Sequence, residues 1–136
     1  MHNREVADPT LDIMADIAAF FSRSLAIAER AGIGRDQIVL DPGIGFGKSV
    51  DHNLALLARQ RELVSLGSPL LVGWSRKTTL GTLTGRSVDQ RLHASVAAAL
   101  IAVERGARIV RVHDVAATVD ALKVWCATIA PEERTP

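Results

Sequence analysis

Apolar residues recur at helical spacing along the first quarter of the chain. The positions that follow this spacing are Leu11, Met14, Ile17, Phe21 and Leu25. Side chains three or four residues apart share one face of a helix, and a glycine commonly ends such a helix. The pattern therefore predicts an amphipathic helix that opens after Pro9-Thr10 and ends at the glycines of positions 32 and 34.

Short apolar runs alternate with longer helical patterns in the rest of the chain. The runs are residues 37–40, 69–72 and 108–113. Helical patterns follow each of them: one from Asp51 to about residue 66, a short turn at 79–83 with a long helix at 88–104, and a last helix after Asp114. Strands that alternate with helices, without a hairpin signal between strands, are typical of a parallel sheet. We expect an α/β fold in which Asp51 and Asp114 cap their helices.

The loop at residues 43–49 (GIGFGKS) has the composition of a nucleotide-binding loop but fails both spacing tests. A phosphate loop that ends at Lys48-Ser49 needs glycine at position 42, which is Pro42. A dinucleotide fingerprint that begins at Gly43 needs glycine at position 48, which is Lys48. Both classes of nucleotide site are excluded, and the glycines serve either a close approach to a ligand or a tight turn.

Polar residues gather directly after each predicted strand, where α/β folds bind their ligands. Asp41 follows the first run; it could accept two hydrogen bonds from an amino-imino edge of a heterocycle, or could simply cap its turn. Arg76 and Lys77 follow the second; Lys77 could serve a ligand or pair with Asp41, while Arg76 fits a solvated loop.

Arg111 and His113 lie two positions apart at the end of the third run, so on a strand they would share one face. Buried charge requires compensation, and a bound anion would supply it; the alternative is that both side chains end the strand in water. His52 and His93 fall on helical patterns and are expected to be surface or packing residues.

Composition removes several classes of function. The chain has 136 residues, 48% hydrophobic and 23% charged, with a formal net charge of +1, so no strong basic field points to nucleic acid. Its apolar stretches are too short to span a membrane, and its first residues do not read as a signal peptide. Cys126 is the single cysteine of the sequence, which excludes an internal disulfide and fits a cytoplasmic location. We expect it to be a small apolar residue of the core.

Three motifs occur in order: residues 41–48 (DPGIGFGK), 71–77 (LVGWSRK) and 111–115 (RVHDV). Together they resemble the signatures of the dihydropteroate synthases, over nearly the whole chain, and Met1-His2 is similar to the end of that family's fifth barrel strand. The resemblance implies a transferase of folate biosynthesis. It would condense 6-hydroxymethyl-7,8-dihydropterin diphosphate with 4-aminobenzoate to give 7,8-dihydropteroate and diphosphate.

The resemblance also implies a set of site residues. Those expected to contact the substrates are Asp41, Gly45, Phe46, Gly73, Lys77, Thr78, Arg111 and His113. Asp41 and Lys77 would hold the pterin, while Arg111 and His113 would bind the diphosphate. Phe46, Lys77 and Thr78 would border the aminobenzoate pocket, in which Gly45 and Gly73 leave room. Lys77, Arg111 and His113 are the expected catalytic residues, and none of the residues is expected to bind metal.

The family has a (β/α)₈ barrel of roughly 250 residues, so residues 1–136 are expected to form one partial barrel, its C-terminal half, with three to four βα units. The Mg²⁺ that the resemblance implies would take its protein ligand from the missing N-terminal half, and the isolated chain would be a poor catalyst. A homodimer through the late helices is also expected. Two other readings stay open: a non-catalytic assembly of half-barrels, and a methyltetrahydrofolate-binding module of a methyltransferase.

Overall fold

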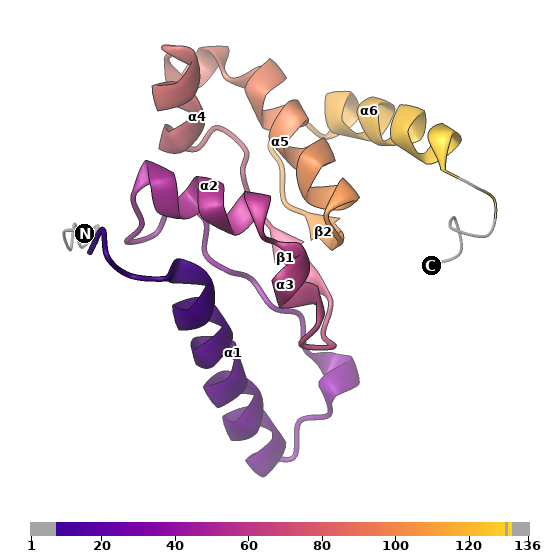
Figure 1. The fold of residues 1–136 in the computed structure, drawn as a ribbon. Helices are drawn as coiled ribbons and strands as arrows, with labels where there is room; N and C mark the ends of the chain where they lie inside the picture. The colour runs from indigo at the N-terminus through magenta and orange to yellow at the C-terminus, as the bar shows by residue number, and fades with distance from the viewer. Residues whose placement is uncertain (1–7, 130, 132–136) are drawn as a thin grey trace.

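The computed structural model describes residues 8–129 and 131. The helices are α1 (Ile13–Arg30), α2 (Val50–Ala58), α3 (Arg61–Val64), α4 (Thr78–Thr84), α5 (Leu92–Glu104) and α6 (Val115–Thr128). The strands are β1 (Leu70–Val72) and β2 (Ala107–Val110), and the 3₁₀ turns are η1 (Arg35–Gln37) and η2 (Val88–Gln90). Figure 1 shows β1 and β2 in the middle of the ribbon, with α1 and α6 on opposite sides. The expected resemblance at Met1-His2 lies outside the described residues.

The strands pair in parallel, as the sequence predicted. Leu71 faces Ile109 and Val72 faces Val110, and Leu40 joins β1 through an isolated parallel bridge to Leu70. The predicted strand at residues 37–40 is therefore reduced to one bridge. The reason is local: the backbone N–H of Gln37 donates to the carbonyl of Gly34 at 3.0 Å, which closes a 3₁₀ turn instead of extending a strand.

The third predicted strand is also shorter than expected, because β2 ends at Val110. The backbone N–H of Arg111 still donates to the carbonyl of Val72 at 3.0 Å. The N–H of His113, however, donates to the side chain of Ser75 at 3.2 Å, so the chain has left the ladder there. Arg111 and His113 thus lie in the loop after β2 and not on one strand face.

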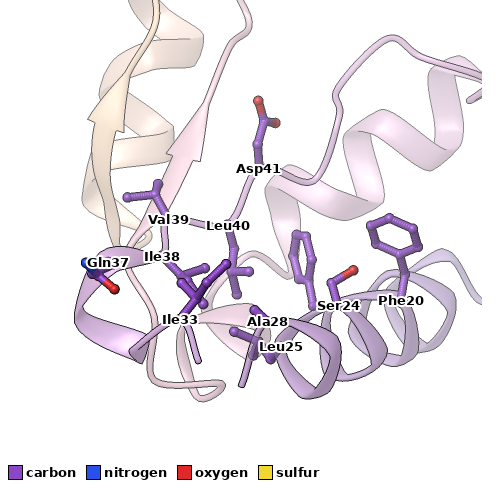
Figure 2. A pocket seen from close by; sticks show the side chains of 11 residues that line it. Phe20, Ser24, Leu25, Ala28, Ile33, Gln37, Ile38, Val39, Leu40 and Asp41 are labelled. Atoms are coloured by element: carbon purple, nitrogen blue, oxygen red, sulfur yellow. The ribbon is translucent and has the colours of Figure 1, made fainter. Parts of the chain in front are cut away.

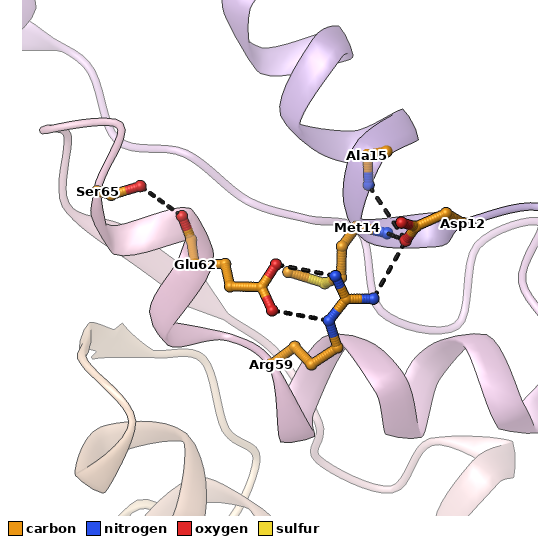
Figure 3. A network of polar contacts seen from close by, with 6 residues as sticks. All are labelled: Asp12, Met14, Ala15, Arg59, Glu62 and Ser65. Carbon is orange, nitrogen blue, oxygen red and sulfur yellow. Dashed lines mark hydrogen bonds and ion pairs between the residues drawn. The ribbon is translucent and has the colours of Figure 1, made fainter.

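Helix α1 begins at Ile13, and its buried face confirms the predicted periodicity apart from Leu11, which is outside the helix and exposed. Asp12 caps the helix by accepting backbone N–H groups of Met14 and Ala15 at 3.1 and 3.4 Å. Figure 3 shows that Arg59 joins this cap to the next helices: its guanidinium lies 3.2 Å from Asp12 and 2.7 Å from Glu62. The start of α1 is thereby tied to the α2–α3 junction.

Two capping expectations are wrong. Ser49, not Asp51, caps α2, and its Oγ accepts the N–H of His52 at 3.1 Å. Asp114 occupies the N-cap position of α6 but makes no capping bond with its side chain, because its carboxylate lies 3.1 Å from the guanidinium of Arg76.

The predicted second helix is interrupted between α2 and α3 at Arg59 and Gln60. Gln60 is almost fully buried, and its Nε2 donates to the carbonyl of Ala102 at 2.8 Å and to that of Arg105 at 3.2 Å. The carbonyl of Arg105 and the end of α5 are satisfied by this amide, which fastens the interruption to the core. The long predicted helix at 88–104 is likewise divided into η2 and α5.

The core lies where α1, α2 and α5 cover the strands. Its most buried apolar residues include Met14, Phe21, Leu40, Leu56, Leu63, Leu70, Val72 and Ala102. Helix α6 contributes little to this core, since Thr118 is its one buried residue among those described. Cys126 is exposed, so the expectation of a core cysteine is wrong. Of the two helical histidines, His52 is buried and His93 is exposed. Among the described residues, none of the helices combines the length and apolar character that crossing a membrane requires.

Candidate functional site

The polar residues singled out by the sequence collect at the carboxyl ends of the parallel strands. Asp41 follows Leu40, the segment from Gly73 to Lys77 follows β1, and Arg111 follows β2. Parallel strands end at a common edge, so residues far apart in the chain meet there.

Arg111 lies over Gly73 and extends toward Asp41. A Cβ placed on Gly73 would lie 3.0 Å from Nη2 and 3.2 Å from Nε of Arg111. Nη1 of the same guanidinium is 3.9 Å from Oδ2 of Asp41, and both side chains are at least one-third exposed. This ion pair is long and solvated, so it leaves the guanidinium free to meet another anion. In this structure, Gly73 makes room for Arg111.

Asp41 also has the turn role that the sequence offered as an alternative. Its Oδ1 accepts the backbone N–H of Gly43 at 2.9 Å, while Oδ2 faces Arg111. The two roles use different oxygens and are compatible. The turn uses only Oδ1, so Oδ2 stays available to a ligand.

Gly45, Phe46 and Lys77 form a second group. The Nζ of Lys77 lies 4.2 Å from the centroid of the Phe46 ring, a cation–π distance. A Cβ on Gly45 would be 3.1 Å from Cδ of Lys77, so this glycine lets the lysine stem pass. Within the described part of the chain the ion pair at Asp41 comes from Arg111, so a direct ion pair between Lys77 and Asp41 is not formed.

Burial lowers the pKa of Lys77, and the positive charge of Arg111 lowers it further, while Asp41 acts in the opposite direction. Thr78 follows Lys77 as the first residue of α4 and is exposed. Both residues therefore stand at the start of a short helix beside the glycine loop.

Lys48, which the sequence offered only as part of the glycine loop, holds that loop closed. Its Nζ donates to the carbonyl oxygens of Gly43 at 2.8 Å and Phe46 at 3.0 Å. Burial lowers the pKa of Lys48, with Lys77 acting in the same direction and Asp41 and Asp16 opposing. The carbonyl bonds explain why a half-buried cation is tolerated there.

Asn53 is a positioning residue that sequence reasoning missed. It is 1% exposed, accepts the backbone N–H of Gly45 at 3.0 Å and donates to Oγ1 of Thr79 at 3.0 Å. One amide thus joins the glycine loop to α4, the helix that Lys77 precedes. The sequence signal for Asn53 was a polar residue within an apolar helical pattern. The sequence does not reveal its two hydrogen-bonding partners, Gly45 and Thr79.

The loops after β1 and β2 are joined by two side-chain pairs at successive positions. Oγ of Ser75 is 2.8 Å from Nδ1 of His113, and Arg76 forms its ion pair with Asp114. Arg76 is exposed in the turn after β1, as the solvated-loop expectation had it, and its backbone has a left-handed φ of 59°. Its N–H donates to Oγ of Ser95 at 2.9 Å. The conformation that presents Ser75 and Lys77 is therefore fixed by α5 and by the β2 loop.

A cavity of about 480 Å³ lies between α1 and residues 37–41. Figure 2 shows its side chains, which are mainly apolar and include Phe20, Leu25 and Leu40, with Asp41 at its edge. Lys77, Arg111 and His113 are not among its lining residues. The cavity adjoins the site but does not contain its charged groups.

These features define an α/β protein whose candidate ligand-binding edge lies at the carboxyl ends of parallel strands, as in (β/α)₈ barrels. The chain belongs to the family of pterin binding enzymes, whose profile matches residues 1–113.

Individual relatives agree with this family assignment. The dihydropteroate synthase of Haemophilus influenzae is 48% identical over 117 residues, which cover 86% of this chain and 42% of that protein. The Stenotrophomonas maltophilia dihydropteroate synthase with imidazole in its active site superposes with a TM-score of 0.87 at 53% identity, covering 96% of this chain and 49% of that one. The Xanthomonas albilineans enzyme in complex with 7,8-dihydropteroate gives 0.86 at 48% identity, covering 94% and 48%.

The chain thus spans less than half the length of each of these three proteins. Its fold corresponds to part of a dihydropteroate synthase barrel and is consistent with the C-terminal part, which confirms the fold class predicted from the sequence.

Proposed function

We propose that residues 1–136 form one partial barrel domain that carries the pterin and diphosphate contacts of a dihydropteroate synthase. The reaction would join 6-hydroxymethyl-7,8-dihydropterin diphosphate to 4-aminobenzoate. The observation that carries this proposal is the meeting of Asp41, Arg111 and Lys77 at one strand edge, with Arg111 over Gly73. A Xanthomonas albilineans homologue is solved with 4-aminobenzoic acid and another Xanthomonas structure holds 7,8-dihydropteroate, which supports these ligands.

The described residues suit a reaction in which charge leaves with a diphosphate. The bond between the pterin methylene carbon and the diphosphate oxygen breaks, and its electron pair departs with the diphosphate. The aniline nitrogen then forms a bond to that carbon and loses a proton. Arg111 and His113 would stabilise the departing anion, and Asp41 and Lys77 would hold the pterin. Phe46 and Thr78 would border the aminobenzoate. The reaction needs no protein nucleophile, because the protein acts by positioning the two substrates.

Magnesium enters only through family resemblance. The described residues contain no group of three or more His, Cys, Asp or Glu side chains that could hold a metal ion. The described residues therefore supply no preformed cluster of protein ligands for Mg²⁺. We propose that its protein ligand lies in the part of the relatives that this chain does not span, and that the isolated chain has little or no activity.

Calorimetric titration of the purified chain with the pterin diphosphate, with and without Mg²⁺, tests the proposal. We expect binding that Arg111→Ala abolishes while the fold, followed by circular dichroism, is retained. Unchanged affinity in Arg111→Ala would remove the diphosphate role, and absence of any binding by the folded chain would show that the remaining strands are indispensable. Binding of the pterin without any response to free diphosphate would favour the methyltetrahydrofolate-module alternative.

An open sheet edge favours the alternative of an assembly between half-barrels. Leu40 exchanges hydrogen bonds with Pro69 and Leu71 on the β1 side. The backbone groups of its neighbours Val39 and Asp41 find no hydrogen-bonding partner on the opposite side among the described residues. Unpaired backbone groups at a sheet edge favour pairing with a strand of another chain. Light scattering at micromolar concentration tests this, since a monomer would remove it.

We also propose a dimer through α6 and a cytoplasmic location. The exposed apolar side chains Val115 and Val119 on α6 support the dimer. The variant Val119→Asp should give a monomer if α6 forms the interface, whereas Val39→Asp, at the open edge, should leave that dimer intact. The free thiol of Cys126 fits a reducing compartment.

A further inference from the structure

We infer that Ser75 is a positioning residue that holds His113 in one neutral tautomer, with the proton on Nε2. This inference rests on the proposed role of His113 as a donor to a phosphate-type anion. Ser75 is buried at 6% exposure, whereas His113 is exposed. The buried Ser75 hydroxyl therefore contacts an exposed imidazole that could otherwise adopt either neutral tautomer.

Two contacts define the hydroxyl. Oγ of Ser75 accepts the backbone N–H of His113 at 3.2 Å and lies 2.8 Å from Nδ1 of the same residue. A serine hydroxyl has one proton to donate and two lone pairs. Among the described residues its contacts are these two groups of His113, so Nδ1 is its available acceptor.

The alternative arrangement leaves a polar group unmatched. If Nδ1 carried the proton, Oγ would accept from both the ring and the backbone N–H, and its own O–H would be left without a partner in a buried position. Unpaired buried donors are unfavourable. With the proton on Nε2, the hydroxyl donates to Nδ1, and all three groups are satisfied. Nε2–H is then a hydrogen-bond donor, which is what an anion needs from a neutral imidazole.

The neighbouring residues hold Ser75 in place for this task. Arg76, the next residue, has its N–H bound by Ser95 and its guanidinium by Asp114, the residue after His113. The β1 loop is therefore fixed to α5 through Ser95 and to the β2 loop through Asp114, one position beyond the Ser75–His113 contact. Movement of the Ser75 backbone away from the β2 loop would strain these bonds as well.

Two-bond ¹⁵N–¹H correlation spectra of the ¹⁵N-labelled full chain, recorded where the imidazoles are neutral, test the inference without ligand. We expect an unprotonated Nδ1 and a protonated Nε2 for His113, at limiting shifts. His93, exposed on α5, serves as an internal reference and should show averaged shifts. A protonated Nδ1 in the unmodified chain would overturn the inference even if no variant folded.

The variant series separates positioning from general structure. Ser75→Ala should move the His113 shifts to averaged values like those of His93, and Ser75→Thr, which keeps the hydroxyl, should restore them. With inorganic diphosphate as the probe, Ser75→Ala should weaken binding about fivefold, with recovery in Ser75→Thr. Unchanged His113 shifts in Ser75→Ala would also overturn the inference. Failure of diphosphate to bind any variant would count against the proposed function and leave the tautomer result standing.

Discussion

Arg111 crosses Gly73 so closely that a Cβ at position 73 would lie 3.0 Å from Nη2 of the guanidinium. We predict that Gly73→Ala displaces Arg111, because the added methyl group and the guanidinium compete for one space. The obstacle is the far end of a flexible side chain, so the free energy of unfolding should fall by less than about 1 kcal/mol. The affinity for diphosphate should fall about tenfold by calorimetry, which is the loss of one charge-assisted hydrogen bond.

A double-mutant cycle separates this effect from other changes at Gly73. In an Arg111→Lys background, which keeps a positive charge but has no guanidinium, Gly73→Ala should cost little further affinity, because its effect acts through the guanidinium. Additive losses would mean that Gly73 serves the ligand directly.

The two oxygens of Asp41 give a matched pair of variants. Asp41→Asn retains an acceptor for the N–H of Gly43 but loses the negative charge near Arg111. It should leave the free energy of unfolding within about 0.5 kcal/mol and weaken pterin binding by about 2–3 kcal/mol. Asp41→Ala should in addition destabilise the turn by about 1 kcal/mol. Equal pterin affinity in the unmodified chain and Asp41→Asn would show that Asp41 is only a turn cap.

Asn53 is predicted to determine the order of the glycine loop. Asn53→Ala leaves the N–H of Gly45 and the hydroxyl of Thr79 without their present partner. The free energy of unfolding, measured in urea, should fall by about 1–3 kcal/mol. Asp51→Ala, on the exposed side of the same helix, is the control and should change it by less than about 0.5 kcal/mol. Equal losses in the two variants would contradict this role.

Arg76 combines a left-handed backbone with an ion pair, and glycine and alanine variants distinguish the two contributions. Both lose the pair with Asp114, but only glycine adopts the φ of 59° without strain. Arg76→Gly should therefore be about 1 kcal/mol more stable than Arg76→Ala in urea unfolding. At Arg35, in η1, the order should reverse. A more stable alanine at position 76 would mean that the loop relaxes to another conformation.

Lys77 should titrate below the ordinary lysine range of about 10.4, because burial and then Arg111 lower its pKa. The unfolded chain then binds more protons than the folded one between the folded pKa and the ordinary value. The free energy of unfolding should consequently rise with pH across that window.

Replacing Arg111 by glutamine removes one positive neighbour, so in Arg111→Gln the pKa of Lys77 should move up and the alkaline rise in stability should shrink. Nuclear magnetic resonance of the lysine Nζ groups measures the first effect, and alkaline urea titrations measure the second. Arg35→Gln, which changes a guanidinium on η1, is the charge-matched control. A Lys77 titration that is the same in Arg111→Gln and Arg35→Gln would contradict the assigned cause.

Much of the fold follows from local pattern. The spacing of Met14, Ile17 and Phe21 identifies α1, because a helix face is set by neighbours three and four residues away. The placement of Asp41, Lys77 and Arg111 at strand ends follows from strand–helix alternation, because parallel strands share one carboxyl edge. Residue types and order were enough to predict that these groups gather at one edge.

The tertiary structure alone decided which groups touch. Asn53 and Thr79 are 26 positions apart, and Ser75 and His113 are 38 apart, so their pairing depends on how α2, α4 and the β2 loop pack. The same holds for the errors. The carboxylate of Asp114 pairs with Arg76 instead of capping α6. Cys126 is exposed because α6 packs few of its side chains against the core. Hydrophobic periodicity specifies which face of an element is apolar, but the partner of each polar atom is set by long-range packing, which no local pattern encodes.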